Sequence, residues 1–283
     1  MIAFMIAVIV ISALLLLIAF SVAPGHVKAE ICAPFYGRNI AHRGLFSADQ
    51  SIPENSLAAF DLAGEKGYGA ELDVQLTKDG HVVVFHDDTL SRMCGVDARV
   101  VEYTLEELGE LRLKETDQKI PLFSDVLKTV DGRGPLIVEL KTGKRNRELC
   151  EKTYALLKEY EGEKCIESFD PFIVGWFRRH AKGLFRGFLS QPPRDYGDSA
   201  KDRLTGFLLG NAFLNFIARP HFIAYKIGKK TLPVRFCLNL GAVPVAWTAH
   251  DTGAEADYDV VIFEHYEPEI RYKKAPDGKE NEK

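Results

Sequence analysis

The sequence has few cysteines, and their arrangement excludes two common classes of protein. Five cysteines in 283 residues are widely spaced and form no Cys-x-x-Cys pair: Cys32, Cys94, Cys150, Cys165 and Cys237. This odd, scattered set fits neither a disulfide framework nor a cysteine zinc site. We interpret the thiols as small apolar core residues of a protein in a reducing compartment. A GxGxxG loop is also missing, which disfavours a dinucleotide-binding sheet.

An excess of positive charge is missing as well. The chain has 36 Lys and Arg against 40 Asp and Glu, a net charge of -4. This balance argues against a nucleic-acid-binding protein with a broad basic face. Apolar residues make up 46% and charged residues 27%, which is typical of a packed domain and excludes a disordered chain. Any phosphate chemistry must therefore depend on a local site.

The apolar residues are concentrated at the N-terminus. Residues 1–22 contain twenty apolar residues, two serines and no charge, enough to span a bilayer, which needs ~20 residues. Signal peptides usually have a charged start and a shorter apolar core, so residues 1–23 are interpreted as a transmembrane anchor. Cleavage after Ala29 is the alternative. Because Lys28, Arg38 and Arg43 follow the helix, the positive-inside tendency predicts that the large domain is cytoplasmic, with an extracytoplasmic domain as the alternative.

After an expected tether at residues 24–37, residues 38–271 alternate β-rich runs with helical ones, the pattern of successive βα units. Expected helices include residues 54–65, 147–160 and 171–179, and residues 51–54 resemble a capping box for the first of them. The eight expected strands lie at residues 38–42, 70–75, 135–141, 164–169, 185–190, 221–226, 243–248 and 258–263. Eight such units predict an α/β fold, a closed (β/α)8 TIM barrel; an open doubly wound sheet is the alternative.

Three segments depart from this alternation. Residues 78–85, with Asp79-Gly80 between β-prone runs, predict a hairpin that extends the second strand. Residues 87–128 then form an insertion with two short helical pieces, far longer than the ~2 to 6 residues of an ordinary βα loop. Residues 204–218 are apolar and aromatic, and we expect a barrel helix there, with contact to a membrane surface as the alternative. The charged residues 272–283 are expected to be a solvated tail.

Carboxylates recur at the ends of two expected strands. Glu71 and Asp73 are two residues apart, so they lie on one face of their strand, as do Glu139 and Lys141 on the next. Unpaired carboxylates inside a barrel are costly and require a cation. Glu71, Asp73 and Glu139 form an all-oxygen set suited to one divalent cation, Mg²⁺ or Ca²⁺. The alternative is that each carboxylate pairs with a Lys or Arg.

Two histidines also stand at strand ends, His42 after the first strand and His86 after the hairpin. Histidine titrates near neutral pH, so one imidazole could accept a proton from a nucleophile while the other donates to a leaving oxygen. Arg43 offers a planar fork of donors and Lys141 a point charge, and both suit phosphate oxygens. A single histidine here would more often be a hydrogen-bonded core residue.

Five runs together resemble the signature of the glycerophosphodiester phosphodiesterase family. They are residues 39–44 (NIAHRG), 53–56 (PENS), 71–80 (ELDVQLTKDG), 83–87 (VVFHD) and 138–141 (VELK), and the likeness extends over residues 39–265. The resemblance implies a (β/α)8 barrel that uses a divalent cation to hydrolyse glycerophosphodiesters to sn-glycerol 3-phosphate and an alcohol.

The resemblance also implies roles for individual residues. His42 and His86 would be the general acid/base pair, and Arg43 and Lys141 would hold the phosphate. The metal ligands would be Glu71, Asp73 and Glu139, and Phe169 and Trp247 would border the substrate. The insertion would be a small helical cap beside the site. Glu54 belongs to the family motif, but the capping box accounts for it, so we interpret it as structural.

Two stretches depart from the family pattern, residues 249–251 (AHD) and residues 263–268 (FEHYEP). They leave the alcohol group of the substrate open. The expected protein is therefore a membrane-anchored hydrolase of small glycerophosphodiesters. The alternatives are a phospholipase C-like or lysophospholipase D-like enzyme on intact lipids, or a non-catalytic membrane-anchored binding protein. The sequence leaves open whether water or the glycerol hydroxyl attacks first, and what the oligomeric state is.

Overall fold

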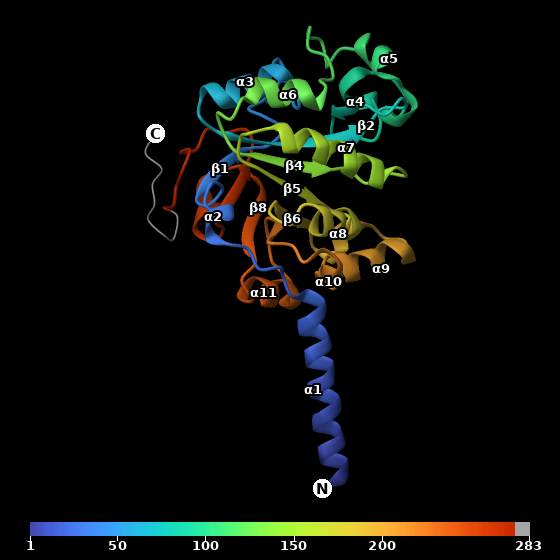
Figure 1. Ribbon diagram of the computed structural model, residues 1–283, viewed down its shortest axis with the longest axis vertical. Coiled ribbons are helices and arrows are strands. Elements are labelled where there is room, and N and C mark those ends of the chain that lie inside the picture. The colour runs from blue at the N-terminus through green and yellow to red at the C-terminus, as the bar shows by residue number, and fades with distance from the viewer. Residues whose placement is uncertain (275–283) are drawn as a thin grey trace.

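Eight parallel strands close into a barrel in this computed structural model, which describes residues 1–274. The barrel confirms the expected (β/α)8 TIM fold and excludes an open sheet, because β9 pairs with β1 and β1 also pairs with β2 (Figure 1). The barrel strands in order are β1 (Arg38–Ala41), β2 (Gly69–Leu76), β4 (Leu136–Leu140), β5 (Lys164–Ser168), β6 (Phe185–Ser190), β7 (Phe222–Lys226), β8 (Val243–Ala249) and β9 (Val260–Phe263).

The inside of the barrel changes from apolar to acidic along the strands. An apolar cluster at the amino ends includes Ile137, Cys165 and Phe185. Two residues further along the same strands, and therefore on the same face, stand Glu139 and Glu167. The apolar layer closes the amino end of the barrel, so polar chemistry is confined to the carboxyl end, where barrel enzymes build their sites.

Helices surround the barrel, and most of them pack apolar residues against the outer faces of the strands. They are α3 (Leu57–Glu65), α6 (Phe123–Val130), α7 (Asn146–Glu159), α8 (Pro171–His180), α9 (Ala200–Leu209), α10 (Asn215–Ala218) and α11 (Leu232–Asn239), with the 3-10 turns η2 (Pro193–Tyr196) and η3 (Thr252–Ala256) between strands.

The start of α3 differs from the prediction. The sequence predicts a helix from residue 54 with a capping box at residues 51–54, but α3 begins at Leu57. Ser56 is the N-cap, and its hydroxyl accepts a hydrogen bond from the backbone N of Ala59 at 3.1 Å. Residues 53–55 are therefore non-helical, which leaves the side chain of Glu54 for other contacts.

The expected hairpin is present, with β3 (Val82–Val84) antiparallel to the end of β2. Beyond it α4 (Ser91–Cys94), η1 (Val100–Glu102) and α5 (Leu105–Gly109) pack around their own apolar cluster. The expected insertion at residues 87–128 extends into α6, but α6 packs against α3 and belongs to the ring of barrel helices. The small helical region therefore ends before α6 begins.

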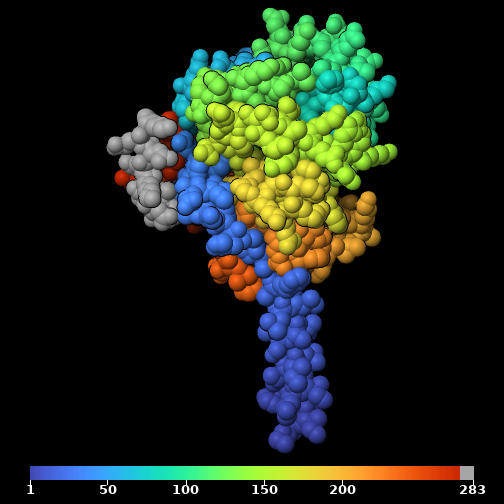
Figure 2. All heavy atoms as spheres, viewed as in Figure 1, coloured from blue at the N-terminus to red at the C-terminus, as the bar shows by residue number. Residues whose placement is uncertain are grey.

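The N-terminal helix α1 (Ile2–Val22) projects from the barrel as a stem (Figures 1 and 2). By length and composition it can cross a membrane, a test that a signal sequence also meets. The sequence predicts a short tether at residues 24–37. Instead, this segment contains α2 (Ala29–Cys32) and packs on the barrel, because Phe35 is only 1% exposed and its ring lies 5.4 Å from that of Phe185.

The C-terminal segment also contacts the barrel as far as it is described. Tyr272 Oη and Lys273 Nζ both donate hydrogen bonds to the carbonyl of Tyr258, at 3.2 and 2.6 Å. The rest of the expected solvated tail, residues 275–283, lies outside the described residues.

Candidate active site

Acidic side chains meet at the carboxyl ends of three neighbouring strands. The strand register places Asp73 on β2 beside Glu139 on β4, and Glu139 beside Glu167 on β5. Glu71, Asp73 and Glu139 each offer one oxygen, and these oxygens lie within 4.8 Å of one another. Two oxygens bound ~2.4 Å from one Ca²⁺ are at most about 4.8 Å apart. The three buried carboxylates can therefore hold one divalent cation.

The electrostatics of this acidic group also fit a cation. Burial, reinforced by Asp73, Glu167 and Glu139, raises the pKa of Glu71 well above its ordinary value. Burial likewise raises the pKa of Glu167, whose buried Oε2 has no hydrogen-bond partner among the described residues. A bound cation would favour the ionised form of these two carboxyls and offset the cost of burying their charge.

Lys141 lies among these carboxylates. Its Nζ is 2.9 Å from Glu139 Oε1 and 3.3 Å from Asp73 Oδ1. Burial raises the pKa of Asp73, but Lys141, His86 and Arg43 together outweigh burial and hold this pKa below its ordinary value. Asn55 donates a hydrogen bond to Asp73 Oδ2 at 2.9 Å. The structure thus places the ammonium group of Lys141 against two of the expected metal ligands.

His42 is held by the last strand of the barrel. Its backbone N donates to the carbonyl of Phe263, and its Nδ1 lies 2.6 Å from Glu264 Oε2. The other ring nitrogen, Nε2, is 3.9 Å from Glu71 Oε2. Burial lowers the pKa of His42, although the hydrogen bond with Glu264 opposes this effect. The imidazole is therefore neutral near pH 7.

His86 likewise has a carboxylate at Nδ1. Its Nδ1 lies 2.7 Å from Asp87 Oδ1. Gln75 fixes the backbone of this segment, because its Nε2 donates to the carbonyls of Phe85 and Asp87 at 2.8 Å each. An ionised carboxylate only accepts hydrogen bonds, so Nδ1 of each histidine must carry the proton. Nε2 of both rings is then available for proton exchange.

Glu54 connects two arginines and does not cap a helix. Its Oε1 lies 2.6 Å from Arg43 Nη1 and 2.6 Å from Arg92 Nη2. Arg92 also binds Asp87, with Nε 2.7 Å from Oδ2. The prediction that Glu54 serves a capping box is therefore wrong. This buried carboxylate orients Arg43 towards the site and connects it to the helical insertion.

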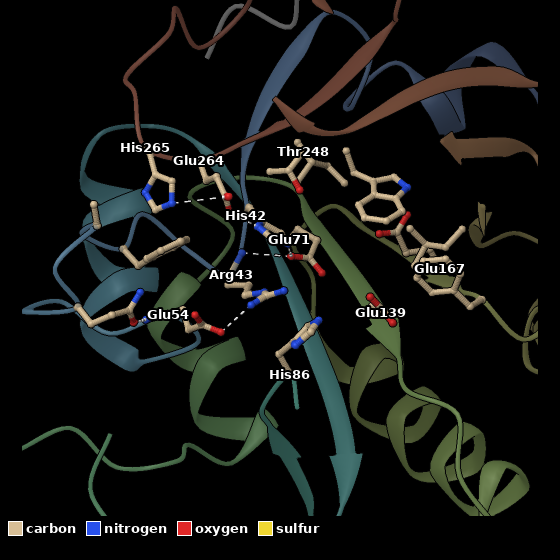
Figure 3. A pocket seen from close by; sticks show the side chains of 17 residues that line it. His42, Arg43, Glu54, Glu71, His86, Glu139, Glu167, Thr248, Glu264 and His265 are labelled. Atoms are coloured by element: carbon tan, nitrogen blue, oxygen red, sulfur yellow. Dashed lines mark hydrogen bonds and ion pairs between the residues drawn. The ribbon is translucent and has the colours of Figure 1, made fainter. Parts of the chain in front are cut away.

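The side chains surround a cavity of about 490 Å³. Figure 3 shows Glu71, Glu139 and Glu167 on one side of it and Arg43 with Glu54 on the other. Of the expected site residues, His42, Arg43, Glu71, His86, Glu139, Phe169 and Trp247 line the cavity. Asp73 and Lys141 join them through Glu139. The rings of Phe169 and Trp247 meet edge to face, 5.7 Å apart, and form an apolar wall.

The structure adds residues that the sequence analysis did not single out. Glu264 and Glu167 stand at strand ends, so the rule that selected Glu71 and Glu139 could have found them. Asp87 directly follows His86 at the end of the run at residues 83–87. Arg92 gave no signal, because its contacts with Glu54 depend on how the insertion folds back over the site.

The fold and the site together define a class of protein: a parallel barrel with acidic and imidazole groups gathered at its carboxyl end. Comparison with known proteins gives the family. The glycerophosphoryl diester phosphodiesterase family model matches residues 42–258, which is most of the chain. The chain belongs to this family, whose members are phosphodiester hydrolases.

Named relatives and solved structures agree with this assignment. A glycerophosphodiester phosphodiesterase of Caldanaerobacter subterraneus is 37% identical over 54% of this chain and 66% of its own length, just under two thirds. A lysophospholipase D of Rattus norvegicus is 34% identical over 46% of this chain and 43% of its own length. An Oleispira antarctica phosphodiesterase, solved with its product sn-glycerol-3-phosphate, has a TM-score of 0.65 at 24% identity and shares the fold over 81% of this chain and 93% of its own.

Proposed function

We propose that this protein hydrolyses glycerophosphodiesters to sn-glycerol 3-phosphate and an alcohol. One observation carries the proposal: two imidazoles, each with Nδ1 on a carboxylate, face the same cavity as an acidic group and Arg43. Membership of the family supports this assignment. The product-bound structure of a protein with the same fold supports the substrate class.

We assign the base to His42 and the acid to His86. His42 is neutral near pH 7, so its Nε2 can remove the proton from the attacking hydroxyl, which belongs to water or to the glycerol of the substrate. His86 is more exposed, at 33% of its side chain, and lies where a leaving group can depart. It donates its Nε2 proton to the oxygen of the leaving alcohol as the P–O bond breaks.

The remaining residues bind the substrate and the cation. Glu71, Asp73 and Glu139 would hold one Mg²⁺ or Ca²⁺, which when bound polarises a phosphoryl oxygen. Arg43 would hold the phosphate through its planar guanidinium, which Glu54 keeps in place. Lys141 would contact the phosphate from beside Glu139, and Phe169 and Trp247 would pack against carbon atoms of the substrate.

A second candidate is lysophospholipase D activity on lipids that keep one acyl chain. The apolar wall of Phe169 and Trp247 and the N-terminal apolar helix favour it, as does the likeness to a lysophospholipase D. The phosphate chemistry would be the same, and only the substituent on the glycerol would differ.

A product assay on the full chain in detergent tests and separates these candidates. Glycerophosphocholine, glycerophosphoglycerol and lysophosphatidylcholine would be supplied with Mg²⁺ or Ca²⁺, with and without chelator. Release of sn-glycerol 3-phosphate that stops with chelator is the expected result. Release of lysophosphatidic acid would instead assign the lysophospholipase D activity. No turnover of any substrate with either metal would contradict both and favour a binding protein.

Replacement of either histidine tests the proton-transfer roles. His42→Ala and His86→Ala should each lower kcat by about 10² to 10⁴, the range for one proton-transfer group, while the chain stays folded. His81→Ala, on the exposed hairpin, is the matched control and should retain full activity. Activity that survives both site substitutions would remove these residues from the mechanism.

We also propose that α1 anchors the protein with its barrel in the cytoplasm. The basic residues Lys28, Arg38 and Arg43 follow α1, which supports this orientation. Protease added to intact cells should leave the barrel whole, whereas protease added to inverted membrane vesicles should degrade it. The reverse pattern would place the barrel outside the cytoplasm.

A further inference from the structure

The end of α1 is built into the barrel domain. Arg219 Nη1 donates hydrogen bonds to the carbonyls of Phe20 and Ala23, at 2.8 Å each. Asn215 Nδ2 donates to the carbonyl of Val22 at 3.0 Å. These carbonyls lie at the helix C-terminus, where no partner within the helix exists, and residues of the α10 segment satisfy them. No flexible linker therefore separates the apolar helix from the barrel.

This junction fixes the distance between a membrane and the barrel. The 21 residues of α1 span about 31 Å at ~1.5 Å per residue, close to the ~30 Å hydrocarbon core of a bilayer. With α1 across the membrane, one bilayer surface must lie at its last turn. The helices that contact this turn are α10 and α11, and Figure 1 shows them on either side of it. Both helices are thus placed at the level of the lipid head groups.

Exposed apolar side chains gather on the same side of the domain. After α1, the part of the chain that the structure describes has ten large apolar residues classed as exposed, and seven of them lie between Leu204 and Leu240. The seven are Leu204, Phe207, Phe216, Ile227, Leu232, Phe236 and Leu240. Phe216 stacks on Phe20 of α1 with ring centroids 6.0 Å apart, so this apolar surface is continuous with the stem.

The helix α11 is apolar on both its faces. Val234 and Cys237 are buried against the barrel. Leu232, Phe236 and Leu240 recur every four residues, so they share the opposite, exposed face. Exposure of such an apolar face to water is unfavourable, whereas its burial at the boundary between head groups and acyl chains is favourable.

Charge points to the kind of surface that this face meets. Residues 200–240 contain seven Lys or Arg and one Asp, in a chain whose net charge is -4. Of these, Lys201, Arg203, Lys229 and Arg235 are exposed among the apolar residues. Basic side chains that flank exposed Phe and Leu are typical of segments that bind anionic lipid surfaces.

We propose that α9, α10 and α11 form a collar around the end of α1 that binds the surface of a bilayer containing anionic lipids. The collar comprises the seven apolar residues above with their basic neighbours. In this arrangement α1 is retained in the folded protein, and the barrel lies directly on the membrane surface. This inference concerns placement only and holds whatever the catalytic activity is.

Lipid photocrosslinking tests the collar on the wild-type full chain. The protein would be reconstituted in nanodiscs of phosphatidylcholine and phosphatidylglycerol that carry a diazirine on the upper acyl chain, and adducts would be mapped by mass spectrometry. Adducts are expected on α1 and on residues 204–240. Val101, Phe172 and Ile270, which are also exposed, at 38%, 63% and 40%, provide the internal control and should carry none. Adducts confined to α1 would overturn the proposal.

A variant, the intact mass of the chain and the number of chains per nanodisc complete the test. The triple substitution Leu232→Glu, Phe236→Glu and Leu240→Glu should abolish adducts on α11, whereas Val101→Glu, Phe172→Glu and Ile270→Glu should change none. The intact mass of the chain from its host membrane should include residues 2–22; a mass that lacks them would overturn the proposal. Two chains per nanodisc together with an absence of collar adducts would assign the face to a second copy instead.

Discussion

At the scale of single residues, each histidine of the site depends on a carboxylate neighbour. Glu264, which directly follows β9, holds His42, and Asp87 holds His86. Opposing influences act on Glu264: burial raises its pKa, but the hydrogen bond with His42, together with the nearby His265 and His250, outweighs this and keeps the pKa below its ordinary value. Glu264 is therefore ionised and fixes the proton of His42 on Nδ1. It is a positioning residue that acts through His42.

Glu264→Gln should lower kcat/KM by about 10² to 10⁴, because an amide no longer enforces the reactive tautomer of His42. It should also move the acid limb of the pH profile. His42 works as a base only when unprotonated, and its lowered pKa places the wild-type limb below pH 6.5. Loss of the Glu264 charge, which raises that pKa, should shift the limb to still lower pH.

Steady-state kinetics from pH 5 to 8 would measure both effects, with exposed Glu267→Gln as the matched control. A Glu264→Gln enzyme with the wild-type rate and an unmoved limb would show that His42 does not need this partner.

At the scale of elements, the start of α3 decides where Glu54 and Asn55 point. Ser56 caps the helix, so the residues before it remain free to contact Arg43 and Asp73. Ser56→Ala should destabilise the protein by about 1 kcal/mol, the usual cost of a lost N-cap. Ser51→Ala, at the cap that the sequence predicts, should change stability by less than about 0.5 kcal/mol. Thermal unfolding of the two variants side by side would compare them. Equal losses would contradict the observed cap.

The same helix shows how far the sequence could predict structure. Each expected strand overlaps an observed one, because runs of β-branched and aromatic residues bounded by turn residues are local signals. The local pattern predicts the cap at residues 51–54, whereas Ser56 forms it in the structure. When α3 starts at Leu57, Glu54 contacts Arg43 and Arg92, and Arg92 is 38 residues away in the sequence. Element types were thus predictable, whereas the starting residue of this helix depended on tertiary contacts.

The site follows the same division. Glu71, Asp73, Glu139 and the two histidines were predictable because strand periodicity and strand ends place them without further information. The partner carboxylates come from distant segments: Glu264 lies 222 residues from His42. The packing of residues 24–37 on the barrel was also missed, because Pro24 and Gly25 read locally as a linker, whereas Phe35 meets Phe185 only in the closed fold.

At the scale of the whole molecule, the barrel separates stability from chemistry. The apolar layer at its amino end supports the strands, and the carboxyl end carries buried acids that burial keeps from ionising easily. Burial likewise raises the pKa of Glu139, with Asp73 adding to this and Lys141 opposing it. A divalent cation at this end relieves the repulsion among the acids, so ion binding should couple to proton release.

The central claim is that Glu71, Asp73 and Glu139 hold one divalent ion beside the two imidazoles. Titration calorimetry of Mg²⁺ and Ca²⁺ into the chelator-treated full chain tests it most directly, in two buffers of different ionisation enthalpy and at several pH values. Glu71→Gln with Glu139→Gln would be compared with exposed Glu115→Gln with Glu159→Gln, a pair matched in charge. The account predicts one ion per chain, release of protons on binding, weaker binding as pH falls, and loss of binding only in the site variant. A site variant that binds the ion as tightly as the wild type would contradict it.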